Sequence, residues 1–215
     1  MVLDSKRKSA DPFLEPFARK LVRVDPNAVS AIAIILAFLA GLAFYFSTEN
    51  WELLLPLAAI LVIVSGFLDA LDGKIARLAG KASKKGDFVD HVLDRYADVF
   101  MIGGVAISAW CNPFVGILAI VGVLLTSYMG TQAQALGAGR LYAGLLGRAD
   151  RVMLLTVIPL IQWAVMFYST GWFTIGSFTF SIMELMMIYF AVVGNFTAVQ
   201  RAVTVWKRLG KQDQS

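Results

Sequence analysis

Residues 69–94 read DALDGKIARLAGKASKKGDFVDHVLD, so that acidic side chains stand on two largely apolar segments joined by a basic loop. In a helix, residues three or four apart share a face, so Asp69 lies beside Asp72 and Asp90 lies beside Asp94. Four carboxylates brought together from two neighbouring helices repel one another unless a positive charge lies between them. Hard divalent cations bound by oxygen ligands are the usual solution. The stretch therefore predicts a metal site made of these four aspartates.

The composition predicts a helical, polytopic membrane protein. Of the 215 residues, 58% are hydrophobic and 16% are charged, and the mean hydropathy is +0.70. Such a chain has too little polar surface for a soluble domain. The net charge of +4 does not indicate nucleic acid binding, because in a membrane protein the placement of positive charges matters more than their sum. The single Cys111 excludes an intrachain disulfide.

Six apolar stretches are long enough to cross a bilayer core, which needs about 20 residues. We expect membrane spans at residues 27–47, 51–78, 86–110, 112–136, 151–170 and 175–206. No cleavable signal peptide is expected, since mostly polar or amphipathic residues precede the first span. Asn27 is expected to cap the first span.

Apolar residues recur on one helical face of residues 11–24, which predicts an amphipathic helix lying on the membrane surface. A short helix docked on the protein is the alternative. The predicted organisation is all-α. It comprises an N-terminal segment with the amphipathic helix (1–26), a six-helix membrane domain (27–206) and a polar tail (207–215).

The distribution of lysine and arginine predicts the orientation in the cell membrane. Six precede the first span, six lie between Lys74 and Arg95, three lie between Arg140 and Arg151, and four lie from Arg201 onward. By the positive-inside rule, both termini and the basic connections are cytoplasmic. Asp69 then lies roughly 27 Å from the outer end of its span, at 1.5 Å per residue. The acids are therefore expected near the cytoplasmic end, whereas a divalent-cation transporter, the alternative from another class, would hold them near the midplane.

Other roles for charged residues in this stretch stay open. The aspartates could be salt-bridge partners of Arg77 and Arg95 rather than metal ligands. Asp98 follows Asp94 by another four residues on the same helical face. We expect it to pair with Arg95 or to support the metal ligands without binding the metal itself. His91 directly follows Asp90 and is expected to point to another side of the helix, where it packs or supports the metal ligands.

Eight residues of the stretch match, without gap or substitution, the pattern D-x-x-D-G-x-x-A-R-x8-G-x-x-x-D-x-x-x-D. They are Asp69, Asp72, Gly73, Ala76, Arg77, Gly86, Asp90 and Asp94. With these residues the chain resembles the CDP-alcohol phosphotransferase family, the class I CDP-alcohol phosphatidyltransferases. The Pro26-Asn27 entry to the first span is also similar to that family.

The resemblance implies a transferase of phospholipid biosynthesis with two divalent cations, magnesium or manganese. It would move the phosphatidyl-type group of a CDP-linked lipid, diacyl or archaeal diether, to a hydroxyl of a small polar alcohol and release CMP. Asp69, Asp72 and Asp90 would hold the metals, and Asp94 would be the general base while also touching a metal. The resemblance further implies that the CDP part binds at Asn27, Gly73, Arg77 and Ser83.

The resemblance also implies a homodimer. Small residues in the third span suggest a helix interface that would support one, namely Gly103, Gly104, Ala106 and Ser108.

The acceptor alcohol is predicted from polar residues at the inner ends of the later spans. The candidates are Ser127, Arg148, Arg151 and Arg201. Arginines suit an anionic acceptor such as an inositol phosphate, because guanidinium groups pair with phosphate through two hydrogen bonds. They can equally be ordinary positive-inside charges.

Two short sequences, Ser127-Tyr128 and Gln200-Arg201, look like the branch of the family that makes phosphatidylinositol phosphate or archaetidylinositol phosphate. That branch usually has basic residues shortly after the Ser-Tyr, where this chain has residues 129–132, MGTQ. Glycerol phosphate and serine therefore stay open as acceptors.

Overall fold

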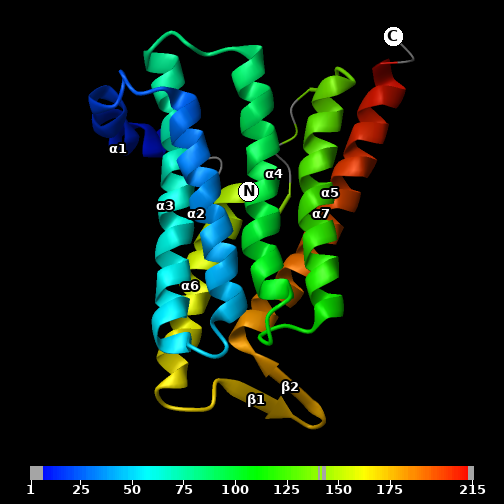
Figure 1. The fold of residues 1–215 in the computed structure, drawn as a ribbon. Helices are drawn as coiled ribbons and strands as arrows, with labels where there is room; N and C mark the ends of the chain where they lie inside the picture. Colours follow the sequence, from blue (N-terminus) through cyan, green and yellow to red (C-terminus); the bar gives the residue numbers. More distant parts are fainter. Residues whose placement is uncertain (1–6, 140, 142–143, 213–215) are drawn as a thin grey trace.

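The computed structural model describes residues 7–139, 141 and 144–212 (Figure 1). Over this part of the chain it contains seven helices and one two-stranded hairpin. The helices are α1 (Arg7–Lys20), α2 (Pro26–Phe46), α3 (Trp51–Leu78), α4 (Lys84–Ala106), α5 (Pro113–Ala135), α6 (Arg148–Met166) and α7 (Ile182–Gln212). The strands are β1 (Trp172–Ile175) and β2 (Phe178–Ser181).

Helices α2 to α7 form a closed ring. Going around it, α2 packs against α3, α3 against α6, α6 against α7, α7 against α5, α5 against α4, and α4 against α2. Large side chains such as Phe44, Trp110 and Phe190 are fully buried where the helices meet. The outside of the ring exposes apolar side chains such as Ile60 and Val192, as expected for a surface that faces lipid.

Five of the described helices, α2, α3, α5, α6 and α7, are long and apolar enough to cross a membrane. The helical, multi-pass prediction is therefore confirmed. Helix α4 does not meet the same criterion, since it carries four aspartates together with Lys84, Lys85 and Arg95.

The predicted cap of the first span is wrong. Asp25, not Asn27, caps α2, and its carboxylate accepts a hydrogen bond from the backbone N–H of Asn27 at 3.0 Å. Pro26 is then the first helical residue, a position where its missing N–H costs nothing.

The start predicted for the last span is also wrong, because α7 begins at Ile182. The preceding residues 172–181 form the antiparallel hairpin, with Phe173 opposite Phe180 and Ile175 opposite Phe178. Aromatic and β-branched residues around a Gly-Ser turn favour this hairpin. An apolar run of this kind was read as the beginning of a helix.

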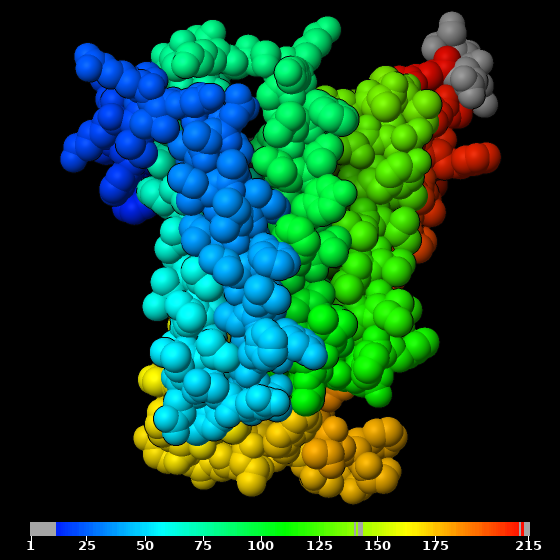
Figure 2. Space-filling model, in the orientation of Figure 1, coloured from blue at the N-terminus to red at the C-terminus, as the bar shows by residue number. Residues whose placement is uncertain are grey.

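Helix α1 packs on α3 beside the acid-bearing end of that helix (Figure 2). The rings of Phe13 and Phe17 lie 6.2 and 5.4 Å from the ring of Phe67. Glu15 forms an ion pair with Lys74 at 3.8 Å. Phe13 and Phe17 remain 64% and 44% exposed, so α1 offers an apolar surface beyond its contact with α3.

Two of the small residues of α4, Gly104 and Ala106, pack closely against neighbouring helices inside the ring. A Cβ added to Gly104 would overlap the carbonyl oxygen of Gly41 on α2. A Cβ added to Gly116 on α5 would meet the Cβ of Ala106 at 2.6 Å. These residues let α2 and α5 approach α4 closely.

Replacing Gly104 with Ala should therefore destabilise the ring by about 1–3 kcal/mol, the usual cost of overpacking. Thermal unfolding of the purified protein in detergent measures this. Gly103→Ala is the matched control, because a Cβ there meets nothing within 4 Å in the described structure. Equal shifts for the two variants would contradict the close crossing of α2 and α4.

Candidate active site

Helix α4 is fixed at its start by Ser83, whose hydroxyl accepts a hydrogen bond from the backbone N–H of Gly86 at 3.1 Å. Helix α3 ends just before, at a glycine in the left-handed region, Gly80, with φ of 67°. The basic connection is therefore short and turns sharply. It places Asp69 and Asp72, near the end of α3, at the same end of the ring as Asp90 and Asp94.

The four predicted acids do converge. Carboxylate oxygens of Asp69, Asp72 and Asp90 lie within 4.8 Å of one another. Ligand atoms of Asp90, His91 and Asp94 form a second group within the same limit. Asp90 belongs to both groups, so two candidate metal positions share one carboxylate.

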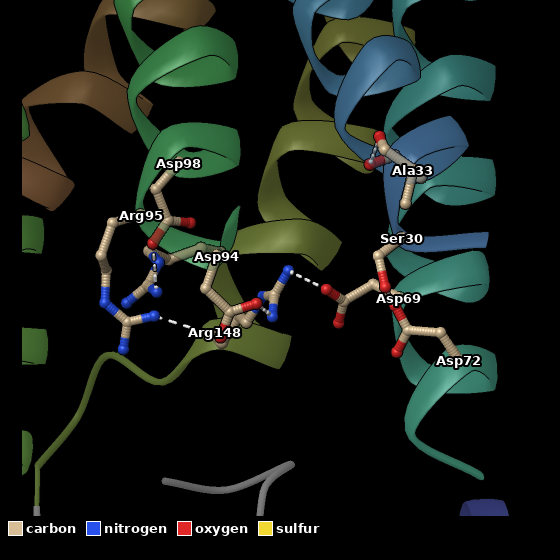
Figure 3. A network of polar contacts seen from close by, with 10 residues as sticks. Ser30, Ala33, Asp69, Asp72, Asp94, Arg95, Asp98 and Arg148 are labelled. Atoms are coloured by element: carbon tan, nitrogen blue, oxygen red, sulfur yellow. Dashed lines mark hydrogen bonds and ion pairs between the residues drawn. The ribbon is translucent and has the colours of Figure 1, made fainter. Parts of the chain in front are cut away.

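Helix α2 lies between α3 and α4 and completes the cluster. It packs against both of these helices. The hydroxyl of Ser30 on α2 donates a hydrogen bond to Asp72 (Figure 3). The hydroxyl of Ser65 on α3 donates to the carbonyl of Ala33 at 2.8 Å. The role of Ser30 was missed, since nothing in the sequence pairs it with a residue so far along the chain.

Arg148 brings positive charge from α6 into the cluster. Its guanidinium group contacts Asp69 at 3.0 Å and also contacts Asp94 (Figure 3). Arg95 donates to the other oxygen of Asp94 at 3.1 Å. The sequence suggested Arg148 only as an acceptor-binding residue, whereas the structure also places it between the acids of α3 and those of α4.

Arg148 occupies this place because α6 begins one turn earlier than the predicted span. The carboxylate of Asp150 accepts a hydrogen bond from the backbone N–H of Gly147 at 2.9 Å, which starts the helix at Arg148. Arg148 thus lies in the first helical turn rather than in a loop.

A small pocket opens beside the cluster. Its walls are three of the acids, Arg148 and mostly small side chains of α2, α3 and α4. The lining residues are Ser30, Ala33, Ile34, Ser65, Asp69, Asp72, Asp90, Leu93, Ala97 and Arg148. Charged groups from α3, α4 and α6 thus meet at this pocket.

The residues present fit divalent cations. Carboxylate oxygens suit magnesium and manganese, and manganese also accepts imidazole nitrogen. The Nδ1 atom of His91 is buried and has no hydrogen-bond partner among the described residues. His91, for which the sequence predicted packing or a supporting role, is therefore also a candidate ligand. Its position three residues before Asp94 was the signal that placed both on one face.

Asp98 pairs with Arg151 rather than with Arg95. The ion pair measures 2.7 Å, and the two residues are 5% and 3% exposed. It joins α4 to α6 one helical turn beyond the contact between Asp94 and Arg148. Since both charges are buried, each depends on the other for compensation.

Removing one member of this pair should destabilise the protein strongly. We expect Asp98→Asn to lower the free energy of unfolding by about 3–5 kcal/mol, because it leaves a buried guanidinium group without a counter-charge. The double variant Asp98→Asn, Arg151→Met should recover most of that loss. Thermal unfolding in detergent compares the two.

Arg19→Gln provides a control on an exposed ion pair. The Arg19 side chain is 72% exposed in its pair with Glu15, and such pairs contribute at most about 1 kcal/mol. An Asp98→Asn variant as stable as Arg19→Gln would show that the Asp98 pair is not a buried one.

The residues predicted for the CDP part lie near the ends of the acid-bearing helices. The Arg77 side chain is exposed and folds back over Gly73, whose added Cβ would lie 3.5 Å from Arg77 Nη1. Asn27 and Ser83 are exposed at the starts of α2 and α4.

Two of the acceptor candidates lie where α5 meets α7. Ser127 is buried on α5. Arg201 on α7 is also buried and donates to the carbonyl of Thr126. A Cβ added to Gly130 would lie 3.3 Å from Arg201 Nη1. Arg140 lies outside the described residues.

Cys111 provides no nucleophile. It lies in the connection between α4 and α5, at the end of the ring away from the acids (Figure 1). Burial and, less strongly, the charge of Glu184 raise the pKa of its thiol to about 12. The thiol is therefore protonated at neutral pH.

The fold and the site together define a multi-pass membrane protein with an acidic cluster of the metal-binding kind. The model of one family, CDP-alcohol phosphatidyltransferase, matches residues 23–206. The chain belongs to this family and is a transferase of phospholipid synthesis. The sequence-based assignment to the family is thus confirmed.

Relatives and solved structures agree with this assignment. The archaetidylinositol phosphate synthase of Pyrococcus horikoshii is 32% identical over 139 residues, which cover 65% of this chain and 71% of the relative. The phosphatidylinositol phosphate synthase of Cutibacterium acnes is 31% identical over 204 residues, which cover 89% of this chain and 91% of the relative.

Crystal structures of the phosphatidylinositol phosphate synthase of Mycobacterium tuberculosis share the fold. The complex with manganese and citrate has a TM-score of 0.73 at 23% identity and covers 90% of this chain and 88% of that one. The complex with CDP-DAG has a TM-score of 0.68 at 23% identity and covers 90% of this chain and 93% of that one.

Proposed function

We propose that this chain transfers the phosphatidyl-type group of a CDP-linked lipid to a hydroxyl of an inositol phosphate and releases CMP. The observation that carries the proposal is the convergence of Asp69, Asp72, Asp90 and Asp94 in one cluster, three of whose acids line a pocket at one end of a membrane-embedded ring. The donor is supported by the mycobacterial relative solved with CDP-DAG. The acceptor is supported by the names of the archaeal and bacterial relatives.

Two divalent cations, magnesium or manganese, are assigned to the acidic cluster. Asp69, Asp72 and Asp90 hold one, and Asp90, His91 and Asp94 hold the other. When bound, such ions neutralise a pyrophosphate and polarise the phosphorus under attack. The manganese complex of the mycobacterial relative supports this assignment.

Asp94 is the proposed general base. Its carboxylate takes the proton of the acceptor hydroxyl while the hydroxyl oxygen bonds to the lipid-side phosphorus of the CDP-lipid. The bond from that phosphorus to the bridging oxygen breaks, and CMP leaves with the bridging oxygen. Arg95, which donates to Asp94 Oδ2, fixes the orientation of the carboxylate. Asn27, Gly73, Arg77 and Ser83 are assigned to the CDP part.

Among the acceptor candidates, Arg148 is supported best. It lines the pocket, and its side chain is 25% exposed, whereas the side chain of Arg151 is 3% exposed in its pair with Asp98. A guanidinium group in this place can bind the phosphate of an anionic acceptor. Ser127 and Arg201 form a second, more distant group of candidates.

The membrane arrangement is part of the proposal. Helix α4 lies in the ring between α2 and α5, so it crosses the bilayer with them and makes a sixth span. The positive-inside rule then places both termini and the acidic pocket at the cytoplasmic face of the cell membrane. Residues 27–206 form the membrane domain, α1 lies on the membrane surface, and two copies form a homodimer.

The acceptor assay tests the proposal. Purified protein, a CDP-lipid and magnesium or manganese are incubated with inositol phosphate, glycerol phosphate or serine, and CMP is measured. We expect CMP release with inositol phosphate. CMP release with serine or glycerol phosphate but not with inositol phosphate would show that inositol phosphate is not the acceptor. Metal flux into proteoliposomes without CMP release would overturn the reaction in favour of a cation transporter.

A further inference from the structure

The β1–β2 hairpin lies at the end of the ring opposite the acidic pocket (Figures 1 and 2). Its strands are joined by Gly176 and Ser177, and the φ of 63° at Gly176 suits a tight turn. The family features described above do not involve this segment.

One face of the hairpin is entirely apolar. Residues paired across two strands share a face, and so do residues two apart along a strand. The register therefore puts Phe173, Ile175, Phe178 and Phe180 on one face. Of these, Ile175 is 70% exposed and Phe178 is 77% exposed.

The opposite face is fastened to the ring. Trp172 stacks on Trp110 with ring centroids 5.8 Å apart. The hydroxyl of Ser181 donates to the carbonyl of Trp110 at 2.8 Å. The hydroxyls of Thr174 and Thr179, also on this face, hydrogen-bond to each other at 3.0 Å. The hairpin is thus held in one orientation.

A buried glutamine on α6 fixes both ends of the hairpin. The amide nitrogen of Gln162 donates to the carbonyl of Gly171 at 3.0 Å. Its amide oxygen accepts from the backbone N–H of Ile182 at 2.9 Å. Because Gln162 is fully buried, these bonds are protected from water and hold the exposed apolar face in place.

The surroundings of the hairpin are free of charge in the sequence. No Asp, Glu, Lys or Arg occurs between Arg151 and Glu184. Directly after α6, Phe167 is 56% exposed and Tyr168 is 92% exposed, so aromatic side chains are exposed at this end of the ring both here and on the hairpin. In water, an exposed apolar hairpin is prone to aggregate.

We propose that the apolar face of this hairpin inserts into the membrane interface of the leaflet opposite the acidic pocket. Its partner is the boundary between lipid headgroups and acyl chains, where aromatic side chains concentrate. The hairpin anchors that end of the ring, whereas α1 lies on α3 near the opposite end.

Spin labels on neighbouring residues of opposite faces test the proposal. In a Cys111→Ala background, nitroxides are attached to Phe178→Cys and Thr179→Cys of the full chain in phosphatidylcholine–phosphatidylglycerol vesicles. Collisions with oxygen, which concentrates in lipid, are compared with collisions with a water-soluble nickel chelate. We expect a several-fold higher oxygen-to-nickel ratio at position 178 than at 179.

A second pair, Ile175→Cys and Thr174→Cys, gives the same comparison should the label at 178 prevent folding. Equal, nickel-dominated ratios on both faces would overturn the proposal, because the hairpin would then stand in water. Labels on the apolar face that are shielded from both reagents and broadened by spin–spin contact would also overturn it, since a second copy would then cover this face.

Discussion

Replacing Asp94 with Asn should lower CMP release by about 10²–10⁴-fold, the usual contribution of a general base. Asn keeps the shape of the side chain but cannot take the proton of the acceptor hydroxyl. The assay measures CMP formed from a CDP-lipid and inositol phosphate at saturating metal. Asp94 is also a proposed ligand of one metal position, so the saturating metal in the assay separates loss of the base from loss of metal affinity.

Asp87→Asn is the matched control. Asp87 is an acid of the same helix, its side chain is 70% exposed, and its ion-pair partner is His91 at 3.8 Å. It lies outside both groups of candidate ligands and only supports one of their members, His91, so at saturating metal this variant should lose far less turnover than Asp94→Asn. Comparable losses in Asp94→Asn and Asp87→Asn would mean that charge on α4, and not a base at position 94, supports the reaction.

Asp90→Asn should have the largest effect on metal binding. Asp90 is the one acid common to both three-residue groups, so its loss weakens both proposed positions. Replacing a residue that only supports a metal ligand costs about 10–100-fold, and a shared ligand should cost at least about 100-fold in affinity. Manganese binding measured by electron paramagnetic resonance gives affinity and stoichiometry without any turnover.

Asp69→Asn separates the two positions, because Asp69 belongs to one group only. We expect this variant to retain one manganese ion per chain and Asp90→Asn to retain none at the same concentration. If the Asp90→Asn variant bound two manganese ions with unchanged affinity, the acidic cluster would not be the metal site.

The sequence predicted the acidic cluster well because its geometry is local. Asp69 and Asp72, like Asp90 and Asp94, share a face through helical periodicity alone. A short connection then brings the two pairs to one end of the molecule. The approximate positions of most helices could also be predicted, since long apolar stretches have few alternative structures, but the start of α7 could not.

The contacts of Arg148, Ser30 and Asp98 could not be predicted in this way. Each of these contacts joins two helices that are distant in sequence. The periodicity within one helix does not show which face it turns toward another helix. Ser30 reaches Asp72 and Arg151 reaches Asp98 only once the ring has closed. The hairpin was missed for a different reason: an apolar run before a long helix reads as its first turns, whatever its β-branched content.

The placement of α2 between α3 and α4 has a consequence for how the acids are spaced. Helix α2 packs against both α3 and α4, and its small buried residues Ala33, Ala37 and Gly41 let the two helices come close enough for carboxylate oxygens of Asp72 and Asp90 to lie within 4.8 Å. A bulkier residue on α2 would widen the gap without touching any reacting atom. The dimensions of the acidic pocket are therefore encoded in side chains that carry no chemistry of their own.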